Sequence, residues 1–68
     1  MYTPKEIKIS EVCVGVTYDI HGDLNPCGHD TVVRKVTRIT DQFIYCECGR
    51  RFIINKNLHV YEWPFYQH

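Results

Sequence analysis

Three of the four cysteines and one histidine form two short clusters. Cys27 and His29 are separated by one residue, as are Cys46 and Cys48, and a glycine beside each cluster permits a sharp turn. Structural zinc usually takes four thiolate or imidazole ligands in a tetrahedron. The sequence therefore predicts a structural Zn²⁺ site whose ligands are Cys27, His29, Cys46 and Cys48.

Other roles for these residues are open at this stage. They could be free thiols and a surface histidine, or Cys13 could join a disulfide. His21 is a substitute for His29 as the fourth ligand. Cys27 and His29 could also act as a nucleophile and its base, but four Cys/His donors close a zinc shell, and we expect no enzymatic activity.

A metal would answer a need set by the length of the chain. The 68 residues allow one domain, 1–68, and a single core of that size is marginal. Small domains commonly add a disulfide, a metal or a partner subunit, and a structural zinc contributes on the order of 10 kcal/mol. We expect residues 1–10 and 64–68 to be loosely ordered tails.

Charge and hydropathy limit the partners and the location. Eight acidic and eight basic residues balance, so the whole molecule has no general attraction for polyanions or membranes. No apolar run approaches the roughly 18 residues of a membrane span, and the N-terminus lacks a signal-peptide core. A cytoplasmic location is the expectation, and its reducing conditions favour thiolates on metal.

The elements that must position these residues are short strands. A turn of helix at 3–6 is followed by alternation from Val12 to Ile20 that leaves Cys13 on the opposite face. In the second strand Val32 and Val36 share a face with Arg34 and Arg38, and a bulge near Lys35 would let both ends bury apolar residues. The predicted strands cover residues 12–20, 31–40, 43–47, 51–55 and 58–63.

These strands and short turns predict an all-β fold, a small five-stranded antiparallel SH3-like barrel or curled sheet held by a zinc knuckle. A two-residue hairpin at Asp41 and Gln42 places Thr40 opposite Phe43. In a straight ribbon His29 would then lie six residues beyond Cys48, which is too far for a shared ion. The sheet must therefore bend to bring the 21–30 loop over the Cys48 turn.

Basic and aromatic residues are the candidates for partner binding. The strands could gather Arg34, Arg38, Arg50 and Arg51 into a cationic patch with Phe43 and Tyr45 nearby for stacking. The alternative is a solvated face whose arginines pair with acidic neighbours. The aromatic tail includes Trp63 and Tyr66, which could cap the core or form a partner-binding patch.

Two motifs carry a resemblance to known families. Pro26-Cys27-Gly28-His29 and Tyr45-Cys46-Glu47-Cys48-Gly49, with Phe52, resemble the knuckles of zinc-ribbon proteins. The run from Arg34 to Asp41 is similar to one in small zinc-binding transcriptional activators of bacteriophages, and the strand order is similar to SH3-like barrels of small phage proteins. The resemblance covers residues 26–52 and implies a phage-type regulator with zinc at the four ligand positions.

Two classes of function remain in play. The first is a protein-interaction module, a regulator or inhibitor of a host protein. The second is a nucleic-acid-binding transcriptional regulator that uses the face carrying Arg34, Arg38, Arg50 and Arg51. The balanced charge favours the first.

Overall fold

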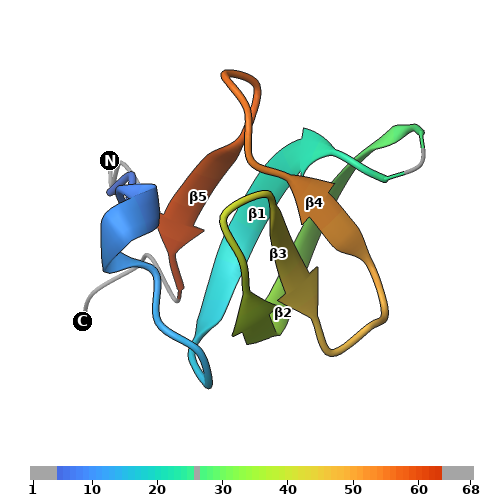
Figure 1. The fold of residues 1–68 in the computed structure, drawn as a ribbon. Coiled ribbons are helices and arrows are strands. Elements are labelled where there is room, and N and C mark those ends of the chain that lie inside the picture. The colour runs from blue at the N-terminus through green and yellow to red at the C-terminus, as the bar shows by residue number, and fades with distance from the viewer. Residues whose placement is uncertain (1–4, 26, 64–68) are drawn as a thin grey trace.

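Five antiparallel strands form one sheet (Figure 1). The computed structural model describes residues 5–25 and 27–63, and the sheet order is β4-β3-β2-β1-β5. The prediction of an all-β antiparallel fold is confirmed. The elements are a 3₁₀ turn, η1 (Ile9–Glu11), and the strands β1 (Thr17–Asp23), β2 (His29–Ile39), β3 (Phe43–Cys46), β4 (Arg51–Ile53) and β5 (His59–Glu62).

The sheet curls without closing. A β-bridge joins Leu24, at the end of β1, to Phe52 of β4, and the Asn25 amide donates to the Arg51 carbonyl at 2.9 Å. Within the described residues β4 and β5 do not pair. Of the two predicted shapes the barrel is therefore wrong, and the sheet keeps two edges.

The first strand begins later than the alternation predicted. Residues 12–16 are not part of β1, because a 3₁₀ turn precedes them and Gly15 adopts φ +91°, which ends the extended conformation. Val12 is buried, but Val14 and Val16 are 58% and 42% exposed. Alternation was a misleading signal here, since β-branched residues also occur in irregular segments.

At its other end β1 continues into the predicted 21–30 loop. It runs to Asp23, and β2 already begins at His29. The connection is short and closed by a hydrogen bond from the Leu24 amide to the Gly28 carbonyl at 2.8 Å. Gly22 is in the strand because its missing side chain leaves room for Leu58, whose Cδ1 lies 2.8 Å from the place of a Cβ.

The hairpin between β2 and β3 agrees with the prediction. The Thr40 amide donates to the Phe43 carbonyl at 2.9 Å, so Asp41 and Gln42 form a two-residue connection. A register shift lies between Val36 and Arg38, slightly beyond the predicted position near Lys35. The extra residue is Thr37, whose hydroxyl donates to the Tyr45 carbonyl at 3.3 Å.

The N-terminal segment extends the sheet beyond β5. Glu6 forms a β-bridge with Tyr61, and the Ile7 amide donates to the Val60 carbonyl at 2.7 Å. Residues 3 and 4 of the predicted helical turn at 3–6 lie outside the described residues, and Glu6 is in extended pairing instead. No helix in the described ranges is long and apolar enough to span a membrane.

The core lies on the inner, concave face of the sheet. Alternate residues of the strands supply it, and among the described residues the largest fully buried side chains are Ile20, Val36, Ile44, Phe52 and Val60. Burial of each is worth roughly 1.5–3 kcal/mol. Their neighbours in sequence consequently point outward, and this alternation decides which candidate site residues meet.

Candidate functional site

Cys46 and Cys48 lie together on the inner side of the sheet. Cys46 is the last residue of β3 and is buried, with an exposed fraction of 4%. Burial, followed by the neighbouring Cys48 thiol, raises the pKa of Cys46 to about 11, so this thiol is protonated at neutral pH. The tight turn that follows relies on Gly49, at φ +87°, and is closed by its amide bond to the Cys46 carbonyl.

His29 is on the opposite side of the sheet from these thiols. The next residue, Asp30, forms an ion pair with Arg50, whose side chain also bonds to Cys48. Because neighbouring residues of a strand point to opposite faces, His29 faces outward. Its Nδ1 lies 3.1 Å from Asp23 Oδ1 on β1.

The structure therefore gathers two of the four predicted zinc ligands. Cys27 is exposed in the connection between β1 and β2, and all four cysteines are free thiols. In residues 5–25 and 27–63 no three His, Cys, Asp or Glu side chains are placed to hold a metal ion. A slip of one residue in the register of β2 would turn His29 inward. The zinc site stays a prediction of the sequence.

Asp23 joins three segments on the outer face. Its Oδ2 accepts hydrogen bonds from the side-chain amides of Asn57 and Asn55 at 3.0 and 3.1 Å, and its Oδ1 faces His29. The Asn57 bond, then those of His29 and Asn55, lowers the pKa of Asp23 to about 2. The carboxylate thus ties the end of β1 to β2 and to the turn before β5.

This arrangement predicts a loss of stability in acid. Because the folded pKa of Asp23 is lower than the ordinary 3.8, its stabilisation is complete above about pH 4 and is lost as pH falls toward 2. Replacement by Asn should flatten this part of the pH profile of unfolding free energy, measured by urea titration. Asp41→Asn is the control, and an equal flattening in it would contradict the assignment.

The bulge separates the predicted arginine patch into two pairs. Arg34 is on the inner side of β2, opposite the buried Tyr18, and its Nη1 donates to the Val33 carbonyl at 2.7 Å. Arg50 is on the same side, paired with Asp30. Arg38 and Arg51 are on the outer side, where both are register partners of Tyr45.

Arg38, Phe43, Tyr45 and Arg51 form one cluster, the aromatic–arginine face. The guanidinium carbon of Arg38 lies 5.4 Å from the centre of the Tyr45 ring. That of Arg51 lies 5.4 Å from the Phe43 ring and 5.9 Å from the Tyr45 ring. The two rings meet edge to face at 6.2 Å. These cation–π contacts hold both cations against the sheet.

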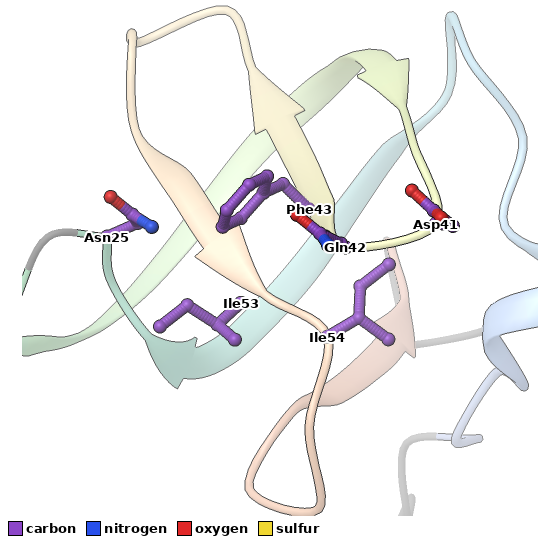
Figure 2. A pocket seen from close by; sticks show the side chains of 6 residues that line it. All are labelled: Asn25, Asp41, Gln42, Phe43, Ile53 and Ile54. Carbon is purple, nitrogen blue, oxygen red and sulfur yellow. The ribbon is translucent and has the colours of Figure 1, made fainter.

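A hollow adjoins this face (Figure 2). It measures about 310 Å³, with apolar walls from Phe43, Ile53 and Ile54 and a polar rim from Asn25, Asp41 and Gln42. The Ile54 amide donates to the Gln42 carbonyl at 2.9 Å. This bond holds together two of the segments that line the hollow. Ile53, Ile54 and Asn25 were not among the predicted site residues, since only the curl of the sheet brings Asn25 to this hairpin.

The remaining predicted site residues lie elsewhere. Trp63 follows β5 and is 40% exposed, and Tyr66 lies outside the described residues. His21 is on the outer face of β1, where its Nε2 lies 3.1 Å from Asp19 Oδ1. The aromatic–arginine face is thus the place where predicted binding residues come together.

No family model matches the sequence, and the searches of curated proteins and of solved structures find no match.

Proposed function

We propose that this chain is a protein-binding module that holds an acidic segment of its partner on the aromatic–arginine face. Tyrosine and arginine are enriched among the residues that dominate binding energy at protein interfaces, and lysine and glutamate are depleted. Here two arginines and two aromatic rings occupy neighbouring positions on three strands. A regulator or inhibitor of another protein would act by binding such an acidic segment of that protein.

The guanidinium groups of Arg38 and Arg51 can bind carboxylates of a partner. In the described part of the chain neither Arg38 nor Arg51 has a carboxylate partner, and the only hydrogen bond of the Arg51 guanidinium there is a long one, 3.4 Å from Nη2 to Asn25 Oδ1. The Arg51 Nε is buried without a partner among those residues. Stacking on the rings restricts the guanidinium groups before binding, so less side-chain entropy is lost.

The hollow indicates which side chain of the partner lies beside its carboxylate. Its volume of about 310 Å³ is at the lower limit of ligand pockets, roughly 300–1,000 Å³. Apolar walls from Phe43, Ile53 and Ile54 suit one branched or aromatic side chain of a partner. The partner segment therefore combines an apolar residue with neighbouring Asp or Glu.

Charge favours protein over nucleic acid as the partner. Arg34 lies on the inner side and Arg50 is already paired with Asp30, so two cations remain on the face. With a net charge of zero, the whole molecule has no general attraction for polyanions, and such attraction supplies a large share of nucleic-acid affinity.

A displayed library of random peptides tests this function. We expect selected peptides to carry Asp or Glu beside an aromatic or branched residue. Fluorescence anisotropy with one of them should show that Arg51→Ala weakens binding roughly 30-fold, which corresponds to about 2 kcal/mol. Arg34→Ala is the matched control and should bind as the wild type does.

An oligothymidine probe provides the opposing measurement. If no peptide is selected and the oligonucleotide binds with an affinity that falls steeply between about 50 and 200 mM salt, the partner is nucleic acid and the proposal is wrong. Equal losses in Arg51→Ala and Arg34→Ala would contradict the assignment to this face.

A further inference from the structure

His21 and His59 are neighbours on the outer surface of the sheet. They are register partners in the β1–β5 pair, and both point away from the core because the adjacent Ile20 and Val60 are buried. Directly opposed residues of an antiparallel pair have Cβ atoms about 4.5–5.5 Å apart. The two imidazoles therefore share one small area of surface.

A carboxylate holds each imidazole at one nitrogen. His21 Nε2 lies 3.1 Å from Asp19 Oδ1, and His59 Nδ1 lies 3.0 Å from Glu6 Oε2. Since a carboxylate only accepts hydrogen bonds, the bonded nitrogen of each neutral ring carries the proton. His21 Nδ1 and His59 Nε2 keep their lone pairs. Metal-binding imidazoles usually have such a carboxylate on the other nitrogen.

We propose that His21 and His59 bind one divalent transition-metal ion between them. Imidazole suits Ni²⁺, Cu²⁺ and Zn²⁺, and water completes the coordination of an ion that has two protein ligands. The Tyr61 ring meets the His21 ring edge to face at 5.3 Å and limits its rotation. The site is distinct from the Cys46–Cys48 pair, which is on the inner side of the sheet.

Binding of the ion joins β1 to β5 at the edge of the sheet. The Glu6 carboxylate that orients His59 belongs to the segment that pairs with β5, so three segments distant in sequence meet at this point. A ligand that binds only the folded state raises the free energy of unfolding. Protons compete with the metal for both nitrogens, so acid should weaken the binding.

Titration of the full chain with Ni²⁺, followed by NMR, tests the proposal. Paramagnetic broadening should appear first at the amides of residues 21 and 59. His21→Asn and His59→Asn should each weaken Ni²⁺ binding at least tenfold, and Asp19→Asn about tenfold. Both histidines are on the surface, and a urea titration of each variant verifies that it folds.

Two matched controls separate this site from others. His29→Asn removes an exposed histidine that also faces a carboxylate but has Asp23, not histidine, as its register partner; it should bind Ni²⁺ as the wild type does. The Cys46→Ser, Cys48→Ser double variant should also bind Ni²⁺ as the wild type does. Wild-type binding by His21→Asn and His59→Asn, or loss of binding in either control, would overturn the assignment.

Discussion

Alanine in place of Phe52 is expected to remove most of the free energy of unfolding. Phe52 has no solvent exposure and forms a β-bridge with Leu24, so its ring lies where β4 curls over β1. A buried Phe→Ala change costs about 3–5 kcal/mol. A domain of this length has in total roughly 3–10 kcal/mol, from about 0.05–0.15 kcal/mol per residue.

Urea titration followed by circular dichroism measures this loss. Phe43→Ala is the matched control, because Phe43 precedes the buried Ile44 and is on the outer face, half-buried under Arg51; its loss should be clearly smaller. Phe52→Leu should retain a folded domain of intermediate stability. A free energy of unfolding for Phe52→Ala within about 1 kcal/mol of the wild type would show that the curl does not depend on this ring.

Valine in place of Gly22 is expected to destabilise the domain by about 3 kcal/mol, the upper end for overpacking. Valine is otherwise favoured in strands, so propensity alone predicts the opposite sign. The reason is contact: a Cβ at Gly22 would lie 2.8 Å from Leu58 Cδ1 and 3.4 Å from Phe52 Cδ1. Leu58 is itself buried and cannot turn into solvent.

A double-mutant cycle isolates this contact. Removing the conflicting atoms with Leu58→Ala should make the Gly22→Val, Leu58→Ala variant more stable than the sum of the single losses. Gly15→Ala is a contrasting control, since Gly15 has open space around it but φ +91°, and its cost comes from backbone strain that Leu58→Ala cannot relieve. Strict additivity at Gly22 would contradict the steric account.

Much of the strand pattern could be predicted from local sequence. The stretch from Tyr18 to Ile20 alternates between apolar and polar residues, and Phe43 to Cys46 is a short apolar and aromatic run. Both are half-buried strands in the structure. The two-residue connection at Asp41 and Gln42 was predicted because it separates two apolar runs. These signals are local, and neighbouring strands are consecutive except where β5 joins β1.

The start of β1 could not be predicted in the same way. Alternation continues through Val14 and Val16, yet these residues are exposed, and the backbone at Gly15 turns away. Gly22, a residue typical of loops, is inside the strand because Leu58 fills the space above it. The local turn at Gly15 thus decided where the strand begins, and a contact between residues more than thirty positions apart, Gly22 and Leu58, decided how far it continues.

The sequence by itself determined that the chain forms short antiparallel strands and which residues could bind metal or a partner. Only the tertiary structure decided which of them share a face. Arg34 and Arg38 have the same parity along β2, so a regular strand would place them together. The bulge at Thr37 inserts one residue, and because side chains alternate with a period of two, Arg38 turns outward to Tyr45 while Arg34 stays inward.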